Sequence, residues 1–200
     1  MSARAPDNVP DVMDEVSLHG QGRPGTVLRW NPKTGQRHLD ELVWGLLPHD
    51  TKDPPNALRP IMARAETIAE HPVFASAFRD RRAIVPMSVY HQRRTIGGAG
   101  QRFAISRKDG QPMAVAGLWE SFRRPDGVID RSYCIITTEA SALIAPFHDR
   151  MLVVLEKEDW PVWLGEQLGD PSQLLRPPAP EILQCKPTGD GQSKPRRRPF

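Results

Sequence analysis

Short stretches of β-forming residues, each closed by a turn signal, run through most of this chain. Asp-Gly pairs occur in "RKDGQP" (107–112) and "RPDG" (124–127), and "RTIGGAGQ" (94–101) is rich in glycine. Such turns are typical of β-hairpins, because Gly and Asp tolerate the positive φ that tight turns between antiparallel strands require. Turns at this spacing leave little room for long helices. The pattern therefore predicts an α+β fold that is mainly antiparallel β and barrel-like, with a few short helices.

Seven segments have the residue pattern of strands, and two have that of short helices. The strand segments are 26–30, 38–48, 83–92, 102–106, 113–122, 132–140 and 151–155, and the helical segments are 72–82 and 156–167. We expect the first two strands to form a hairpin. Pro86 interrupts the third, and since proline has no N–H to donate to a neighbouring strand, we expect an edge or a bulge there.

Composition indicates the cellular compartment in which we expect the protein. No apolar stretch approaches the ~20 residues that span a bilayer, and the N-terminal "MSARAPDNVPDVMDE" lacks the apolar centre of a secretion signal. Cys134 and Cys185 stand far apart and outside any CxxC motif, which fits a reducing compartment. We expect a cytoplasmic protein with no membrane partner.

Positive charge in this chain is clustered rather than abundant. The formal net charge is only +3, but arginines gather in "RDRR" (79–82), "HQRR" (91–94) and "KPRRRPF" (194–200). Such clusters are typical of phosphate-binding surfaces, although a solvated face explains any single one equally well. For the last cluster two interpretations stay open, a disordered electrostatic arm or a remnant of cloning.

Two stretches combine charged groups with the ends of expected strands. In "MARAET" (62–67), Arg64 and Glu66 would share one face of an extended chain; the simpler interpretation is a surface ion pair of little energetic worth. In "FHDRMLVVL" (147–155), an arginine two residues after His148 could hold a phosphate while the imidazole exchanges protons. The simpler interpretation of His148 is a structural hydrogen bond.

A third stretch, "VPMSVYHQ" (85–92), would place Tyr90 and Gln92 on one face of a regular strand and His91 on the other. Standard catalytic signatures are missing, since the sequence has no P-loop, GxSxG, HExxH or GxGxxG motif. No histidine pair has the i, i+4 spacing of a helical metal site. We therefore expect neither a metal nor a cofactor.

Six stretches can be compared with known families by their order and separation: "LVWGLLP" (42–48), "ARAET" (63–67), "FRDRRAIVP" (78–86), "DGQPMAVAGLWE" (109–120), "IITTEA" (135–140) and "HDRM" (148–151). Together they resemble the SOS response-associated peptidase (SRAP) family of abasic-site processing proteins. The resemblance implies a barrel-like SRAP domain over 26–185 with a positively charged cleft. An N-terminal segment, 1–25, would contribute to that cleft, and 186–200 would form a basic tail rich in Pro and Arg.

The resemblance also implies a particular chemistry. In the family, removal of the initiator Met exposes a Cys, whose amine and thiol react with the aldehyde of an abasic site in single-stranded DNA to form a thiazolidine cross-link. Asn, Glu and His surround that Cys, and arginines hold phosphates. An amine condenses with the aldehyde to an imine, a thiolate closes the ring, and acid–base groups move protons.

Carried over position by position, the family's site is only partly retained here. His148 matches the catalytic His, and Arg4, Arg64 and Arg150 match phosphate-binding arginines. Ser2 stands in the place of Cys, Met62 in the place of Asn and Gln92 in the place of Glu. Trp44 is a candidate for stacking on a base, with core packing as the simpler interpretation.

Three of the four chemical positions are therefore changed. A serine at residue 2 keeps the amine once Met1 is removed, but its hydroxyl is a far poorer nucleophile than a thiolate and cannot form a thiazolidine. Gln92 keeps hydrogen-bonding shape but cannot accept and return a proton, and Met62 cannot donate as an amide does.

The leading hypothesis is a monomeric SRAP-like protein that binds single-stranded or abasic DNA in the DNA damage (SOS) response, with the family's cross-linking and self-cleaving peptidase chemistry lost or altered. Two alternatives stay open. One is an abasic-site lyase that uses the α-amine of Ser2 to form a Schiff base. The other is an interaction module that no longer meets DNA.

Overall fold

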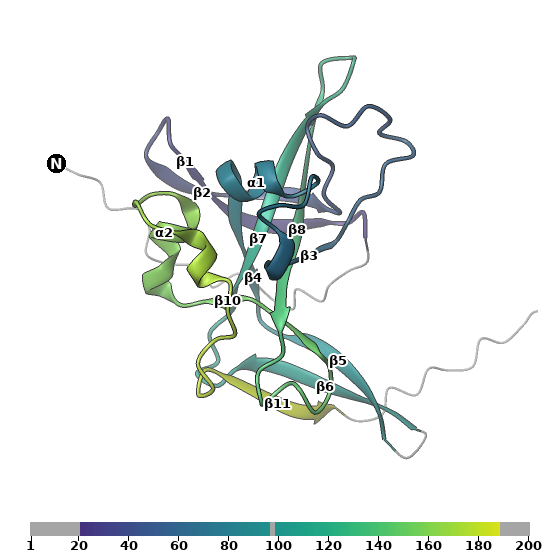
Figure 1. Ribbon diagram of the computed structural model, residues 1–200, viewed down its shortest axis with the longest axis vertical. Helices are drawn as coiled ribbons and strands as arrows, with labels where there is room; N and C mark the ends of the chain where they lie inside the picture. The colour runs from purple at the N-terminus through teal and green to yellow at the C-terminus, as the bar shows by residue number, and fades with distance from the viewer. Residues whose placement is uncertain (1–20, 97–98, 189–200) are drawn as a thin grey trace, which may run out of the picture.

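The computed structural model describes residues 21–96 and 99–188 and consists mostly of strands (Figure 1). The strands of the main sheet are β1 (Pro24–Asn31), β2 (Gln36–Trp44), β3 (Met62–Arg64), β4 (Arg82–Met87), β7 (Met113–Arg123), β8 (Ile129–Glu139), β9 (Arg150–Leu152) and β10 (Val154–Leu155). A second sheet contains β5 (Tyr90–Ile96), β6 (Ala99–Arg107) and β11 (Leu183–Thr188). The helical elements are η1 (Ala65–Thr67), α1 (Ala75–Asp80), η2 (Lys157–Asp159), α2 (Trp160–Leu164) and η3 (Pro171–Leu174).

Five strands of the main sheet close into a barrel. The order β7-β4-β1-β2-β8 returns to its start because β8 also pairs with β7, antiparallel from Gly117↔Ile135 to Arg123↔Ile129. Most neighbours are antiparallel, but β8 runs parallel to both β2 and β3. Closure of the ring removes the free edges that an open sheet would expose. The prediction of a mainly antiparallel, barrel-like α+β fold is confirmed.

The hairpin expected near the start of the described chain is present as β1 and β2, which pair from Pro24↔Val43 to Asn31↔Gln36. Gly35 closes its turn with a φ of 64°, a conformation that glycine adopts without the steric cost of a side chain.

Pro86 lies inside a strand rather than at a break, so the expected interruption is wrong, but on one side of β4 the residue does lie at an edge. It pairs with Ala114 in the middle of the β4–β7 ladder. On the other side of β4, the recorded pairing with β1 is at Leu28↔Ile84. The ladder on that side has ended before Pro86, and its missing N–H costs nothing there. The chain instead breaks after Met87, where β4 leaves the barrel and β5 enters the second sheet.

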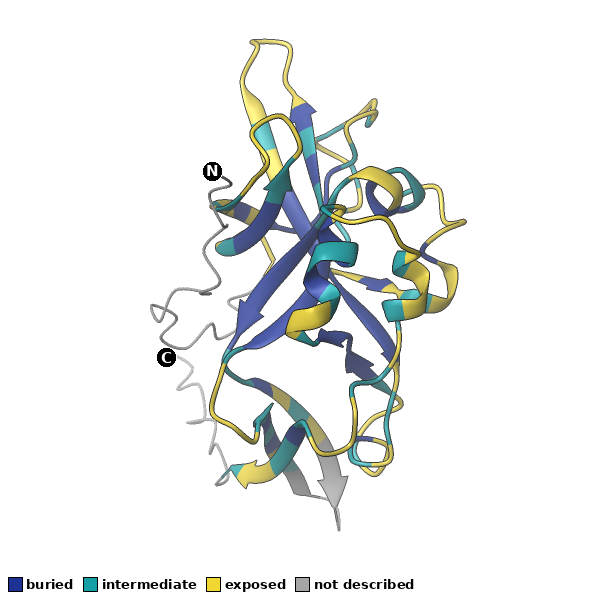
Figure 2. Ribbon diagram, turned by 90° about the vertical axis from the view of Figure 1, so that its left-hand side faces the viewer, coloured by how far each residue is buried: buried dark blue, intermediate teal, exposed yellow. Residues whose placement is uncertain are grey.

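The strands at the centre of the molecule are mostly buried (Figure 2). Side chains of the barrel strands alternate between two apolar clusters. One cluster contains Val85 and Ile135 together with residues of the three-stranded sheet such as Ile105. The other contains Ile84 and Ile136, and α1 and α2 pack on it through residues such as Phe78 and Trp163. This alternation follows from the two-residue period of a strand, whose successive side chains point to opposite faces.

The segment expected to form a single strand over 151–155 is split. Arg150–Leu152 pair with β8 as β9, whereas Val154–Leu155 pair with β7 as β10. The backbone of Val153 between them bonds to both neighbours, since its N–H donates to Ile136 and its carbonyl accepts from Ala116. Strand β11 has no counterpart among the expected segments and pairs with β6 from Leu183↔Arg107 to Thr188↔Arg102.

Candidate functional site

The backbone of Arg150 joins two of the residues that the sequence singled out. Its backbone N–H donates to Nδ1 of His148 over 2.9 Å, and its carbonyl oxygen accepts a hydrogen bond from Nε2 of Gln92 over 3.2 Å. Gln92 comes from β5 of the second sheet, 58 positions earlier in the chain. The structure therefore brings His148, Gln92 and Arg150 together at the contact between the two sheets.

Local structure explains why these side chains meet. Arg150 begins β9 and lies opposite Glu139 at the end of β8, which fixes its backbone. On β5, Gln92 lies opposite Phe103, and the ring of Phe103 contacts that of Phe147 with centroids 4.2 Å apart. This aromatic contact anchors the residue before His148 to the sheet that carries Gln92. As predicted, Tyr90 and Gln92 lie on the inner face of β5, with Tyr90 buried and Gln92 half-buried, whereas His91 is exposed.

The guanidinium group of Arg150 is already engaged within the protein. Nη1 donates to Oε1 of Glu66 over 2.7 Å and Nη2 donates to Oε2 over 2.9 Å, so the pair is bidentate. Nη2 also donates to the carbonyl oxygen of Thr137 over 2.7 Å. The guanidinium holds the pKa of the Glu66 carboxyl below its usual value. The sequence suggested a local pair between Arg64 and Glu66, but the carboxylate bonds to an arginine 84 positions away.

We refer to Arg150, His148, Gln92, Glu66 and Thr137 as the Arg150 cluster. Strand β3 lies beside it, because Arg64 pairs in register with Thr137. Met62 and Arg64 are exposed while Ala63 between them is buried, so Met62 and Arg64 share the outward face of this short strand. Two further positions from the family resemblance therefore lie next to the cluster.

Trp44 is a core residue in this structure. The residue is only 5% exposed, and its Nε1 donates to the carbonyl oxygen of Ile61 over 3.0 Å. The ring therefore has no free face on which a base could stack, and the candidate stacking role is not available to it. Core packing, the simpler interpretation, agrees with this position. Its hydrogen bond to Ile61 holds the chain immediately before Met62 and so positions β3.

Arg64 and Arg150, both expected to hold phosphate, differ in whether their guanidinium donors are already hydrogen-bonded within the protein. Four of the hydrogen bonds described for Arg150 go from its guanidinium to Glu66 and Thr137. Arg64 is exposed and makes no side-chain hydrogen bond or ion pair to any residue described in the structure. A phosphate could bind Arg64 directly, whereas it would have to displace Glu66 to reach the same donors of Arg150.

His148 can hold its proton in two ways. Nδ1 lies 2.9 Å from the backbone nitrogen of Arg150 and 2.9 Å from Oδ1 of Asp149. It accepts from the Arg150 N–H when it is unprotonated, which leaves the proton on Nε2 in the neutral ring. It donates to Asp149 when it is protonated. With its side chain 47% exposed, the imidazole can exchange protons with a ligand in solvent.

Two residues expected at the site cannot be placed relative to the Arg150 cluster, and the two cysteines lie away from it. Ser2 and Arg4 lie outside the residues that the structure describes. Neither cysteine is placed to replace the family's nucleophile. Cys134 is fully buried, which raises the pKa of its thiol to about 12, and Cys185 lies on β11, two strands away from Gln92, with a pKa also raised by burial.

The surroundings of the Arg150 cluster are mixed in charge, because Glu66, Glu139 and Asp149 accompany Arg64 and Arg150. Over residues 21–96 and 99–188, no group of three or more His, Cys, Asp or Glu side chains could hold a metal ion. No helix among the residues that the structure describes is long and apolar enough to cross a membrane.

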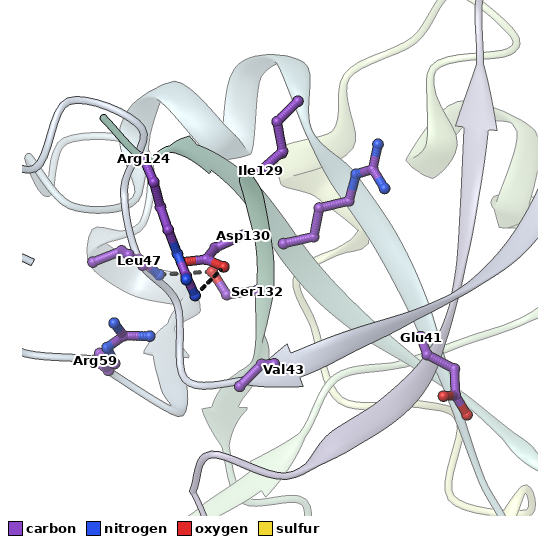
Figure 3. Close-up of a pocket in the computed structure, with 9 residues that line it drawn as sticks. Glu41, Val43, Leu47, Arg59, Arg124, Ile129, Asp130 and Ser132 are labelled. Atoms are coloured by element: carbon purple, nitrogen blue, oxygen red, sulfur yellow. Dashed lines mark hydrogen bonds and ion pairs between the residues drawn. The ribbon is translucent and has the colours of Figure 1, made fainter. Parts of the chain in front are cut away.

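A separate pocket of about 360 Å³ lies at the end of β2 and the start of β8 (Figure 3). Arg124 and Asp130 form a bidentate pair at its wall, with distances of 2.6 and 2.7 Å. Oγ of Ser132 accepts a hydrogen bond from the backbone N–H of Leu47. No residue of the Arg150 cluster lines this pocket.

Sequence reasoning missed Thr137 and the role of Glu66. Thr137 carries no signal of its own, since it is one residue of a long apolar strand. Glu66 was noticed for its neighbour Arg64, but nothing local indicates a partner on β9. Only the parallel pairing of β3 with β8 brings the two segments together.

The closed barrel with helices on one apolar cluster has counterparts among solved structures. A protein from Bacteroides thetaiotaomicron is similar with a TM-score of 0.74 and 25% identity, covering 82% of this chain and 73% of that one. A protein from Bordetella bronchiseptica is similar with a TM-score of 0.73 and 23% identity, covering 84% and 85% of the two chains.

The sequence profile of the family described as SOS response associated peptidase (SRAP) matches residues 8–190. This chain belongs to the SRAP family, as its sequence motifs predicted. It is 36% identical to the abasic site processing protein YoqW of Bacillus subtilis over 137 residues, which are 68% of this chain and 61% of that protein. It is 31% identical to YedK of Escherichia coli, another abasic site processing protein, over 72% of this chain and 64% of that one. The matched part thus spans less than two thirds of these relatives.

Proposed function

We propose that this protein binds single-stranded DNA at abasic sites, through the Arg150 cluster and the adjacent Arg64, as part of a DNA damage response. The convergence of His148 and Gln92 on the backbone N–H and carbonyl of Arg150, with Arg64 on the neighbouring strand, carries the proposal. Further support comes from the names of the relatives, which are abasic site processing proteins.

Each group has a distinct part in this proposal. Arg64 holds a phosphate next to the lesion, since its guanidinium is exposed and has no partner among the described side chains. His148 exchanges protons with the ring-opened sugar through Nε2. Gln92 positions the backbone of Arg150 and moves no proton, because an amide neither gains nor loses one in this pH range. The family's thiazolidine cannot form at Ser2, which has no thiol.

Binding to matched oligonucleotides tests this proposal. We expect the purified protein to bind a single-stranded oligonucleotide with one abasic site more tightly than the intact oligonucleotide, in a fluorescence anisotropy titration. Arg64→Ala should weaken binding to the abasic strand by about tenfold, since a charge-assisted bond to phosphate is lost. Lys33→Ala, which removes an exposed charge elsewhere, is the matched control. Wild-type protein that does not prefer the abasic strand, or Arg64→Ala that binds this strand as tightly as the wild type, would refute the proposal, and no binding to either strand would leave the interaction module.

A second candidate is an abasic-site lyase, and the exposed imidazole of His148 favours it. The α-amine of Ser2 would condense with the aldehyde to an imine and release water. His148 would then take the proton α to the imine carbon, and the 3′ phosphate would leave. Borohydride reduces such an imine to a stable adduct, visible on a denaturing gel. An adduct that disappears when the N-terminus is blocked, together with strand cleavage that is lost in His148→Gln while the adduct remains, would support the lyase, and no adduct would exclude it.

A further inference from the structure

The register of the three-stranded sheet divides its residues between two faces. Tyr90, Ile105 and Cys185 lie side by side across β5, β6 and β11, and the first two are buried in the core. The next residue along each strand therefore points to the opposite, outer face. On that face His91, Ala104 and Lys186 form one row, and Arg93, Arg102 and Thr188 form the next. We refer to His91, Arg93, Arg102 and Lys186 as the basic face.

All four residues of the basic face are exposed, and neither row contains a carboxylate. Arg93 and Arg102 lie directly opposite each other in an antiparallel pair. Like charges in this position repel and destabilise the pairing of the two strands. The arrangement therefore opposes the stability of the sheet that carries it.

Several other arginines of this protein are neutralised by nearby acids. Arg79 pairs with Asp80, Arg124 pairs with Asp130, and Arg107 pairs with Asp109. By contrast, none of the ion pairs found between described residues involves the basic face. Its uncompensated charge points to an anion supplied from outside the chain.

The shape of the face favours an extended anion over a small one. Neighbouring strands lie about 4.8 Å apart, and residues on one face of a strand repeat every ~7 Å. Ala104 leaves the centre of the face flat. Flexible cations spread over two rows of the sheet suit a polymer with a negative charge at each unit, and nucleic-acid phosphates follow one another at about 3.4 Å per strand of a duplex.

We propose that the basic face binds the sugar–phosphate backbone of DNA outside the abasic site, as a second contact that is independent of base sequence. The inference rests on the proposed function for DNA as the polymer. It does not depend on the Arg150 cluster, because Gln92 reaches that cluster from the inner face of β5, while His91 and Arg93 point outward. A surface of this kind would hold the strand whether or not it carries a lesion.

A triple variant, Arg93→Gln, Arg102→Gln and Lys186→Gln, tests the basic face. Affinity for an intact single-stranded oligonucleotide is measured between about 50 and 200 mM salt. Each phosphate contact contributes about 0.7 to the slope of log K against log salt, so the slope should fall by about 2. Over this salt range the affinity of the variant should therefore fall by a factor that is roughly tenfold to twentyfold smaller than the factor for the wild type. The melting temperature should stay the same or rise, because the Arg93–Arg102 repulsion is removed.

The control is a triple variant of equal charge, Arg23→Gln, Lys33→Gln and Lys157→Gln, whose residues are exposed on other elements. It should keep the wild-type slope. An unchanged slope in the basic-face variant, or equal loss in both variants, would overturn the inference. The inference would also be overturned if the wild-type protein bound vesicles of anionic phospholipid and did not bind the oligonucleotide. The preference for abasic over intact DNA reports on the proposed function alone, and we expect the basic-face variant to retain it while Arg64→Ala loses it.

Discussion

Arg150 and Glu66 form a bidentate ion pair across 84 positions of the sequence, with N···O distances of 2.7 and 2.9 Å. The same guanidinium bonds to Thr137, so one side chain ties β9, β8 and η1 together. The geometry makes Arg150 a residue that positions the site as well as a candidate phosphate ligand. Whether DNA displaces Glu66 is then a question of competition between a carboxylate and a phosphate.

Removing the carboxylate of Glu66 should alter the acid stability of the protein. The lowered pKa of Glu66 means that its pairing stabilises the fold above the ordinary pKa, 4.5, and that this contribution is lost as the pH falls through the lower folded-state value. Glu66→Gln should therefore cost stability at neutral pH and nothing in strong acid. Because the Glu66 side chain is 47% exposed, we expect about 0.5–1 kcal/mol, measured by urea unfolding across pH. Glu70→Gln, at an exposed site without a described partner, should show no such dependence.

Gln92→Glu restores the residue type expected in the family but removes the donor that bonds to Arg150. A carboxylate would face the carbonyl oxygen of Arg150, so two acceptors would oppose each other. We expect the unfolding free energy at neutral pH to fall by about 1 kcal/mol. The matched control is Gln167→Glu, at an exposed glutamine. An equal effect of the two substitutions would show that the Gln92 hydrogen bond contributes nothing.

Trp44 should matter for folding and not for stacking on DNA. Trp44→Ala empties a buried site and should lower stability by roughly 3–5 kcal/mol. Trp44→Phe keeps an aromatic ring but loses the bond to the carbonyl of Ile61, so it should cost about 1–3 kcal/mol. Folded Trp44→Phe should keep its affinity for abasic DNA within about twofold in the anisotropy titration, since the ring is buried. A tenfold loss of affinity with an unchanged melting temperature would contradict this view.

The carboxylate of Glu120 is almost fully buried and depends on Arg81. Nη2 of Arg81 donates to it over 2.8 Å, and Nδ1 of His49 lies 3.2 Å away. Arg81→Met leaves a buried charge without its principal partner and should destabilise the protein by about 3–5 kcal/mol. The double variant Arg81→Met and Glu120→Leu removes both charges and should recover much of this loss in chemical denaturation. Equal losses in the single and double variants would argue against the ion pair as the cause.

Much of the fold could be predicted from local signals in the sequence. Turn residues between alternating apolar runs placed the β1–β2 hairpin and the long strands β7 and β8 close to their observed bounds. The same alternation placed Tyr90 and Gln92 on one face of β5 and His91 on the other. Pro86 does not interrupt its strand, because it pairs with Ala114 on one side, and the edge expected there exists only on the other side, where the ladder to β1 has ended. Strand β11 was missed because its pairing with β6 is its main support.

The candidate site, like the fold, depends partly on local sequence and partly on long-range contacts. The residues alone indicate which positions resemble the family's site, which of those positions are changed, and that neither cysteine stands at residue 2. Only the tertiary structure decided that Arg150 bonds to Glu66, that Arg64 stays free, that Trp44 is buried, and that Arg93 faces Arg102. Sequence patterns act over a few residues, through backbone preference and the period of a strand. Closure of the barrel and the parallel pairing of β3 with β8 bring together groups far apart in the chain, and those contacts set charge, burial and access at the site.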